Sequence, residues 1–183
     1  MDHEALVLLS GGIDSTACLH FFIEAGRFPE ALFVDYRQRA AIEERSASKA
    51  VAAHFGVPLR TLKLEGVSEK RDGFIPGRNM FLLSAALLET RHSITTIALG
   101  IHSGTAYADC SKTFLRSAQD ALSLSSDKRI HIAAPFIEWN KQSILEYCSQ
   151  FQLPIGITYS CEQGGEPCGK CFSCKDRVGA DEK

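Results

Sequence analysis

The sequence predicts an α/β protein with a doubly wound, five-stranded parallel sheet. Short apolar runs alternate along the chain with amphipathic segments of helical length. Repeated strand–helix alternation with right-handed crossovers gives a parallel sheet that is covered by helices on both faces. The 183 residues, 45% of them hydrophobic and 23% charged, suffice for one substantial core. We therefore expect a single domain over residues 1–183, with a tail, 154–178, packed as part of it.

The apolar runs and the helical segments define the expected elements. The runs predict strands over Ala5–Leu9, Ala31–Val34, Leu59–Leu64, Ile94–Leu99 and Ile130–Ala133. The segments between and after them predict helices over Asp14–Ala25, Ala40–Phe55, Asn79–Thr90, Lys112–Ser123 and Lys141–Phe151. Ligands of such sheets bind beyond the carboxyl ends of the strands. The residues that follow each strand are therefore the ones to examine for function.

The loop after the first run, Ser10-Gly11-Gly12-Ile13-Asp14-Ser15, is typical of an anion site. A strand that turns through two glycines into a helix brings backbone N–H groups together at the positive end of the helix dipole. We expect Asp14, Ser15 and Thr16 to open the helix by accepting hydrogen bonds from its first free N–H groups. An ordinary tight strand–helix turn is the structural alternative.

This loop resembles the PP-loop, SGGxDS, of the ATP pyrophosphatase superfamily, whose fold is of the adenine nucleotide alpha-hydrolase type. The resemblance implies that ATP is cleaved between its α- and β-phosphates and that the loop binds the pyrophosphate. The nucleotide contacts implied in this way come from one continuous segment, which consists of Leu9, Ser10, Gly11, Gly12, Ile13, Asp14, Ser15 and Thr16.

Four of the seven cysteines crowd into the tail, as Cys161-x6-Cys168-x2-Cys171-x2-Cys174. Four thiolates satisfy a tetrahedral Zn²⁺ ion with no open position, which predicts a structural zinc site. An iron–sulfur cluster is the main competitor, and two disulfides or unligated thiols are further alternatives. The tail has few cations and one internal aromatic residue, Phe172, so we favour a structural role over nucleic-acid binding.

Charge and hydropathy narrow the function classes. A net charge of −2 argues against a broad nucleic-acid surface. No stretch approaches the roughly 20 apolar residues that span a bilayer. The acidic start, Met1-Asp2-His3-Glu4, is unlike a signal peptide, so we expect a cytoplasmic protein.

Motifs along nearly the whole chain resemble the 7-cyano-7-deazaguanine synthase (QueC/ExsB) family of queuosine precursor biosynthesis. Beside the first loop and the cysteine spacing, the matching segments are Asp35–Arg39, Pro76–Asn79, Tyr107–Cys110 and Lys141. The resemblance implies an AMP-forming C–N ligase. The carboxylate of 7-carboxy-7-deazaguanine attacks the α-phosphate of ATP, and ammonia then displaces AMP to give an amide. A second ATP activates the amide oxygen, and loss of AMP leaves the nitrile, 7-cyano-7-deazaguanine (preQ0).

The resemblance also implies roles for individual residues. Catalytic roles fall to Asp14, which either holds Mg²⁺ or caps the helix, and to Arg78 and Lys141, which neutralise phosphate or carboxylate charge. The substrate-binding set consists of Tyr36, Gln38, Arg78, Asn79 and Asp109. Four of these residues have a structural alternative: an ion pair for Arg78, a solvent-facing helix start for Lys141, strand-end packing for Tyr36 and a cap of the Lys112–Ser123 helix for Asp109. We expect His102 to be a hydrogen-bonded loop histidine.

The segments around the base-recognition region depart from the family pattern. Arg37 and Ala40 stand where the family has Gly and His, and the Gly100–Asp109 loop is shorter and less acidic. These changes suggest a paralogue that couples the adenylated carboxylate to a protein amine, as QueC-like proteins of anti-phage defence operons would.

Two other classes remain as alternatives. One is a non-catalytic, zinc-stapled nucleotide-binding regulator. The other is a tRNA sulfur-transfer enzyme, with Cys110 as its reactive cysteine. We further expect a homodimer, a small-molecule deazaguanine substrate and no membrane partner. Ammonia would come from solution or from a partner, because the sequence has no glutaminase segment.

Overall fold

A parallel five-stranded sheet forms the centre of the protein. The computed structural model describes residues 4–70, 75–91, 93–105, 107–127 and 129–181, with side chains up to Arg177. The strands run β3-β2-β1-β4-β5, and every neighbouring pair is parallel. Their bounds are β1 Ala5–Leu8, β2 Pro29–Asp35, β3 Leu59–Lys63, β4 Thr96–Leu99 and β5 His131–Ala133. The predicted fold class is confirmed.

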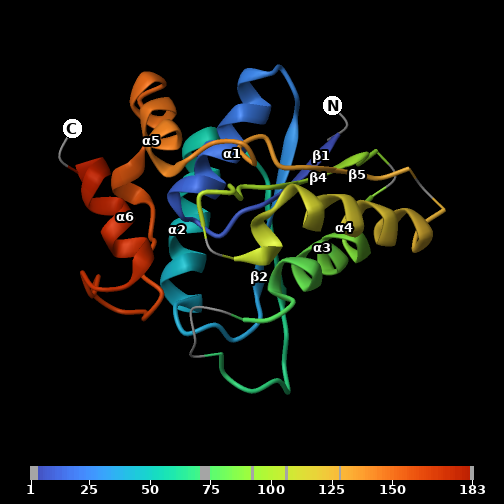
Figure 1. Ribbon diagram of the computed structural model, residues 1–183, viewed down its shortest axis with the longest axis horizontal. Coiled ribbons are helices and arrows are strands. Elements are labelled where there is room, and N and C mark those ends of the chain that lie inside the picture. Colours follow the sequence, from blue (N-terminus) through green and yellow to red (C-terminus); the bar gives the residue numbers. More distant parts are fainter. Residues whose placement is uncertain (1–3, 71–74, 92, 106, 128, 182–183) are drawn as a thin grey trace.

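Helices cover both faces of the sheet (Figure 1). One face carries α1 (Ile13–Glu24), α2 (Ala41–Phe55) and α5 (Lys141–Gln150), and the other carries α3 (Arg78–Leu88) and α4 (Lys112–Leu124). The chain builds β1, β2 and β3 outward and then returns to place β4 on the other side of β1. Right-handed crossovers in opposite directions put their helices on opposite faces. The strand order therefore switches between β1 and β4.

Side-chain alternation along each strand divides the core into two layers. Leu6 and Leu8 of β1 belong to the cluster with α3 and α4, whereas Ala5 and Val7 belong to the cluster with α1, α2 and α5. All four are buried, as are all seven residues of β2. Burial on both faces explains why these strands are continuous apolar runs.

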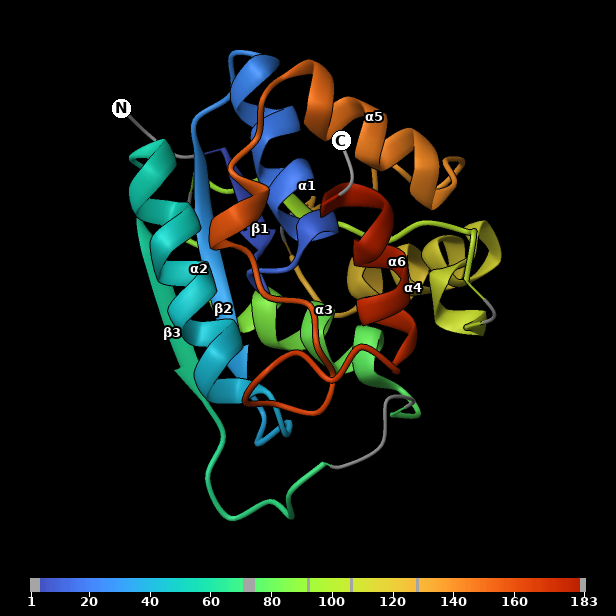
Figure 2. The same cartoon turned by 90° about the vertical axis from the view of Figure 1, so that its left-hand side faces the viewer.

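The C-terminal tail adds an element that the sequence did not predict, the helix α6 (Phe172–Asp181). Arg177 on α6 donates to the Thr158 carbonyl oxygen at 3.0 Å and to the Ile155 carbonyl oxygen at 2.9 Å. These bonds hold the helix against the short 3₁₀ turn η2 (Ile155–Ile157). In Figure 2 the tail runs in front of the lower ends of the strands, and α6 lies near α5.

The remaining differences from prediction are small shifts at element ends. β4 begins at Thr96 rather than Ile94, and α3 begins at Arg78 rather than Asn79. A short 3₁₀ turn, η1 (Ala108–Cys110), precedes α4. None of the helices in the described ranges is long and apolar enough to cross a membrane.

Candidate active site

A cavity of about 510 Å³ opens where the strand order switches, beyond the carboxyl ends of β1 and β4. The loops after β1, β2 and β4, the first turns of α1, α2, α3 and α5, and the tail all contribute to its wall. Most residues predicted for the site line it together. These are Leu9, Ser10, Gly12, Ile13, Asp14, Ser15, Tyr36, Gln38, Arg78, Asn79 and Lys141. Gly11, Thr16 and Asp109 are not among the lining residues.

Close packing fixes the loop between β1 and α1. Gly11 has a φ of +81°, and a Cβ atom there would lie 2.6 Å from the backbone nitrogen of Ser48 on α2. A Cβ atom on Gly100, after β4, would lie 2.4 Å from the Asp14 carbonyl oxygen. Both approaches need glycine, because any side chain would overlap backbone atoms. The sequence showed why Gly11 is glycine, but not Gly100, whose contact is purely tertiary.

The first turn of α1 is built differently from the prediction. Gly12 is the N-cap residue, and no side chain accepts a capping hydrogen bond. The hydroxyls of Ser15 and Thr16 instead donate to the Gly12 carbonyl oxygen, at 3.0 and 2.9 Å. The expectation that Asp14, Ser15 and Thr16 cap this helix is therefore wrong. Uncapped N–H groups at a helix start are the donors that an anion needs.

Asp14 is the centre of a charged group on one side of the cavity. Its Oδ1 atom lies 2.5 Å from Nζ of Lys141, at the start of α5. Its Oδ2 atom lies 3.8 Å from Nε2 of His102, in the loop after β4. Residues that are far apart in the sequence therefore meet at one carboxylate. Lys141 is not a solvent-facing helix start but an ion-pair partner inside the cavity.

His102 has a more specific position than the sequence indicated. The side chain is buried, and its Nδ1 atom accepts from the Gly104 N–H group at 3.2 Å. This bond assigns the ring proton to Nε2, which faces Asp14. Burial lowers the pKa of His102, Asp14 opposes that shift and Lys141 adds to it. His102 is thus the hydrogen-bonded loop histidine that the sequence predicted, and its Nε2 atom also approaches Asp14.

The other side of the cavity holds Tyr36, Gln38 and Arg78. Burial raises the pKa of Tyr36 to about 12, against the opposing effect of a hydrogen bond with Arg78. The Oε1 atom of Gln38 accepts from the Tyr36 N–H group at 2.9 Å. Its Nε2 group donates to the Val34 carbonyl oxygen at 3.2 Å and to Oε2 of Glu44 at 2.7 Å. Gln38 therefore has its amide fully engaged within the protein.

Asn79 and Asp109 contact one another at the start of α3. Asn79 is buried and donates through Nδ2 to the Asp109 carbonyl oxygen at 2.9 Å, and its backbone N–H group donates to Asp109 Oδ2 at 3.4 Å. The alternative that Asp109 caps α4 is wrong, because Ser111 is that cap and accepts from the Phe114 N–H group at 3.1 Å. Asp109 instead supports α3.

The substituted position Arg37 points away from the cavity. It has a left-handed backbone, with φ of 63°, which is unusual for a residue other than glycine. Its guanidinium donates to the Val67 carbonyl oxygen at 3.0 Å. It does not line the cavity. The departure at Arg37 therefore does not add a cation to the site.

The tail contributes a wall that sequence reasoning missed. Residues of the segment around the cysteines line the cavity, namely Tyr159, Ser160, Glu162, Phe172, Ser173 and Asp176. Phe172 is 75% exposed at this position. The cysteine spacing indicates a metal site but says nothing about which face of the domain the site occupies. No sequence signal could have assigned these residues to the cavity.

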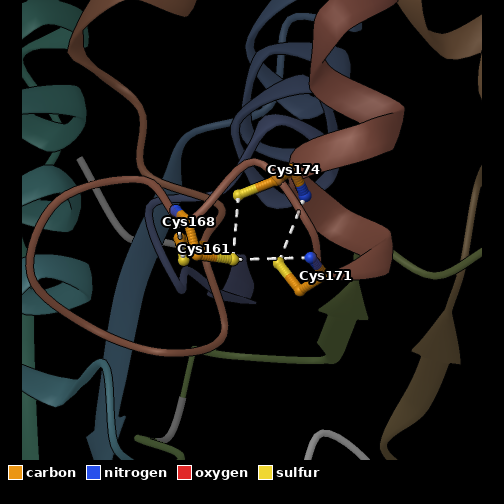
Figure 3. Close-up of side chains that lie close together, drawn as sticks. All are labelled: Cys161, Cys168, Cys171 and Cys174. Atoms are coloured by element: carbon orange, nitrogen blue, oxygen red, sulfur yellow. Dashed lines mark hydrogen bonds between the residues drawn. The ribbon is translucent and has the colours of Figure 1, made fainter.

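The four tail cysteines converge as the spacing predicts (Figure 3). Their sulfur atoms all lie within 4.8 Å of one another, and Cys161 and Cys174 are buried. The cysteines are free, so the disulfide alternative is wrong. N–H groups of Lys170 and Cys171 point at the Cys168 sulfur, at 3.4 Å each, and they lower the pKa of Cys168 to about 6. Four close sulfurs, one of them favoured as a thiolate, suit a closed metal site.

The strand order and the helices on both faces define an α/β protein with a PP-loop-type fold. Two solved structures share the fold. One is a predicted subunit of a tRNA methyltransferase from Methanocaldococcus jannaschii, with a TM-score of 0.57 and 17% identity over 80% of this chain and 74% of that one. The other is a 4-thiouridine synthetase in complex with RNA and bound ATP, with a TM-score of 0.55 and 18% identity over 98% of this chain and 50% of that one.

Sequence relatives identify the family within that class. The family model described as Queuosine biosynthesis protein QueC matches residues 4–183. A 7-cyano-7-deazaguanine synthase from Prochlorococcus marinus is 30% identical over 97% of this chain and 92% of its own. One from Methanosarcina mazei is 29% identical over 97% of this chain and 93% of its own. The chain belongs to the QueC family, and the predicted resemblance is confirmed.

Proposed function

We propose that this protein is an ATP-dependent ligase that converts 7-carboxy-7-deazaguanine to 7-cyano-7-deazaguanine. The carboxylate attacks the α-phosphorus of ATP and releases pyrophosphate, and ammonia displaces AMP to give the amide. The amide oxygen attacks the α-phosphorus of a second ATP and releases a second pyrophosphate, and loss of AMP and of the two amide protons leaves the nitrile. One observation carries this proposal. In a chain of the QueC family, a single cavity holds both the anion-type loop and the cationic side chains Lys141 and Arg78.

The loop supports the pyrophosphate part of the proposal. Gly12 exposes an uncapped helix start at the cavity, and its N–H group lies 3.3 Å from Ser10 Oγ. Backbone N–H groups at a helix N-terminus stabilise phosphate oxygens without any charged side chain. The hydroxyls of Ser10 and Ser15, whose oxygens are 3.1 Å apart, would donate to the phosphate after turning away from one another and from the Gly12 carbonyl oxygen. Residues 9–16 are the proposed contacts for the departing pyrophosphate.

Lys141 and Arg78 would stabilise the charge that develops during adenylation. Lys141 stands beside the loop through its pair with Asp14, and Arg78 stands across the cavity beside Tyr36. A carboxylate and a triphosphate repel one another, so cations between them lower the barrier to attack. Asp14 is the carboxylate of the loop that would hold Mg²⁺, which when bound supplies further neutralisation of the phosphates.

The cysteine cluster would hold Zn²⁺ as a structural ion. Its four sulfurs satisfy the tetrahedral preference of zinc and leave no position for a substrate. The same sulfurs suit iron, so metal analysis must distinguish the two. A bound ion would keep the tail wall of the cavity in place, because Phe172 and Ser173 lie between the ligands Cys171 and Cys174.

A protein amine is the second acceptor that we consider. The loop after β4, where the chain departs from the family pattern, puts the buried His102 into the cavity wall beside Asp14. A changed wall next to the adenylation site favours a changed acceptor. In that case the enzyme would stop at an amide with a protein N-terminus, as a defence-type paralogue would. A cytoplasmic homodimer is the state that we propose for either enzyme.

Mass spectrometry of the products tests the proposal. The metal-loaded protein is incubated with 7-carboxy-7-deazaguanine, ATP and Mg²⁺, together with either ammonium or a peptide. We expect AMP, pyrophosphate and the nitrile in the ammonium reaction. A peptide adduct without nitrile would favour the paralogue. Absence of ATP–pyrophosphate exchange when the carboxylate is supplied would overturn both and favour a non-catalytic nucleotide-binding regulator.

A further inference from the structure

Glu44 is an acidic residue of the cavity wall to which neither the loop nor the family motifs draw attention. It lies in the first turn of α2, and its side chain lines the cavity beside Tyr36 and Gln38. Its Oε2 atom accepts from Gln38 Nε2 at 2.7 Å. A carboxylate has two oxygens and about four acceptor positions. One hydrogen bond therefore leaves most of the accepting capacity of this cavity-lining residue unused.

Gln38 holds Glu44 in a fixed orientation. Both ends of the Gln38 amide are bound, Oε1 by the Tyr36 N–H group and Nε2 by the Val34 carbonyl oxygen as well as by Glu44. The amide cannot turn over without breaking the bond to Tyr36. Because the Nε2 group of Gln38 is held in this orientation, it can only donate to Glu44, and the Oε2 atom of Glu44 must accept. Gln38 is thus a positioning residue, and Glu44 is the side chain that it presents.

The charged groups around Glu44 come from three elements. Arg78 on α3 favours the ionised carboxylate, whereas Asp35 on β2 and Glu43 on α2 disfavour it. Burial is the largest effect, and together they raise the pKa of Glu44 to about 7 despite the bond from Gln38. A ligand that donates hydrogen bonds to this carboxylate would offset the cost of ionising it.

The other acidic side chains at the cavity are already engaged, or belong to the tail. Asp14 is paired with Lys141 at 2.5 Å, and Glu162 accepts from the Ser173 hydroxyl at 2.8 Å. Asp176 is an exposed residue of α6. Asp109, which the family resemblance implied to be a substrate-binding residue, does not line the cavity. Glu44 is the partly buried carboxylate that remains.

We propose that Glu44 is the residue that determines specificity for the base. Its carboxylate accepts hydrogen bonds from the two adjacent N–H groups on the 2-aminopyrimidin-4-one edge of a 7-deazaguanine. This inference rests on the proposed function, which supplies the deazaguanine. N1–H and the 2-amino group present two donors side by side, and a carboxylate is the side chain that accepts both. An adenine edge has one donor and one acceptor and does not match an ionised carboxylate.

Substitution of Glu44 by glutamine tests the assignment in the whole, metal-loaded protein. In Glu44→Gln the new amide would turn its oxygen to Gln38 and its NH₂ group to the ligand donors. We expect affinity for 7-carboxy-7-deazaguanine to fall at least about tenfold by calorimetry, because donors then face donors. Affinity for a non-hydrolysable ATP analogue should change less than about twofold.

Glu43→Gln is the matched control. It removes the same charge from the neighbouring residue, whose Oε1 atom accepts from the Gly165 N–H group at 2.9 Å, a bond that a glutamine oxygen can also accept. Glu43 does not line the cavity. This variant should bind 7-carboxy-7-deazaguanine with the affinity of the unmodified protein. A loss of affinity equal to that of Glu44→Gln would overturn the assignment.

Two readouts separate recognition from a structural role. The first is a ligand without the 2-amino group, 7-carboxy-7-deazahypoxanthine. It should bind the unmodified protein at least about tenfold more weakly than the parent ligand, but bind Glu44→Gln almost as the parent does. The second is pH. Affinity of the unmodified protein should rise from pH 6 to pH 8 as Glu44 ionises through its pKa of about 7, while affinity of Glu44→Gln should stay flat.

The two levels of the proposal fail in different ways. If the unmodified protein does not bind 7-carboxy-7-deazaguanine, the proposed function is wrong. If it binds that ligand and Glu44→Gln binds it equally well, only the role of Glu44 is wrong. If Glu44→Gln instead weakens binding of the ATP analogue, the carboxyl group binds the adenine base and the inference is overturned.

Discussion

The loop at residues 10–15 and the cysteine tail at residues 161–174 reach the same cavity in opposite ways. The loop is placed by its neighbours in sequence, since β1 ends at Leu8 and α1 begins at Ile13. The tail carries its four cysteines within one short segment, and it lines the cavity both through residues 159–162 and through the first turns of α6, which lies far along the chain from the loop (Figure 2). A local motif can therefore define a site, while a second local motif completes it from a distance.

The comparison also shows how differently the two regions tolerate change. The loop has no spare volume, since Gly11 lies against Ser48 on α2. The tail is exposed over much of its length, and it holds its shape through four cysteines and the bonds of Arg177. Packing should dominate the stability of the loop, and the metal should dominate that of the tail.

The largest effect should come from filling the loop. In Gly11→Ala the new methyl group would overlap Ser48 and Ala47, at 2.6 and 2.7 Å, on a backbone with φ of +81°. We expect a loss of about 3 kcal/mol or more in the free energy of unfolding, measured in urea. Gly26→Ala has a similar φ, +70°, but nothing within 4 Å, so it should lose only about 1 kcal/mol. Equal losses would show that packing does not fix the loop.

The next effect should come from the cation beside the loop. Lys141→Met removes the partner of Asp14 and a proposed phosphate contact, so we expect kcat/KM for AMP formation to fall about 100-fold. Lys112→Met is the control, because Lys112 also pairs with a carboxylate, Glu138, but lies outside the cavity. The control should stay within about twofold of the unmodified enzyme. A loss below about fivefold in Lys141→Met would argue against its phosphate role.

A smaller effect on ligand binding should come from the tail. Cys161→Ser removes one of the four sulfurs, so metal analysis should find far less than one zinc per chain. The wall formed by Phe172 and its neighbours would then loosen, and affinity for the ATP analogue should fall about tenfold. Cys148→Ala, buried and outside the cluster, should keep the metal. If the metal-free variant binds the ATP analogue with unchanged affinity, the metal-bound tail does not contribute to ligand binding.

The smallest effect should come from the loop after β2, which contacts the tail through Arg39. Arg37 has a left-handed backbone, so Arg37→Gly should gain about 0.5–1 kcal/mol of stability, reduced by the lost bond to Val67. Arg39 is not left-handed and donates to Gln163 of the tail at 2.6 Å. Arg39→Gly should therefore lose stability in the same thermal unfolding assay. A loss in both variants would mean that Arg37 is not strained.

Particular residues mark the limit of sequence-based prediction. Ser10, Gly12, Tyr36, Arg78 and Lys141 were all expected at the site, and the structure brings them to one cavity. Each follows a strand or begins a helix, and parallel strands direct such residues to a common edge. That rule predicts the edge of the sheet but not the contacts there, so it did not indicate that His102 approaches Asp14.

Asp109 and Glu44 are two residues whose positions relative to the cavity the sequence did not predict. Asp109 lies in a recognisable motif, yet its carbonyl oxygen and carboxylate accept from Asn79, and Asp109 itself does not line the cavity. Glu44 has no motif and reads as one acid on the charged face of a helix. In the structure Glu44 lines the cavity, and Gln38 in the loop after β2 donates a hydrogen bond to its carboxylate. Such contacts depend on packing between elements, which periodicity does not encode.

The sequence by itself determined the strands and the helices other than α6, the family, the anion-type loop and the four cysteines, because each depends on local periodicity or on closely spaced residue types. Only the tertiary structure decided that Lys141 and His102 share Asp14, that α6 and Phe172 wall the cavity and that Glu44 faces the ligand space. These contacts join residues distant in the chain, and their positions follow from strand order and from packing on both faces of the sheet.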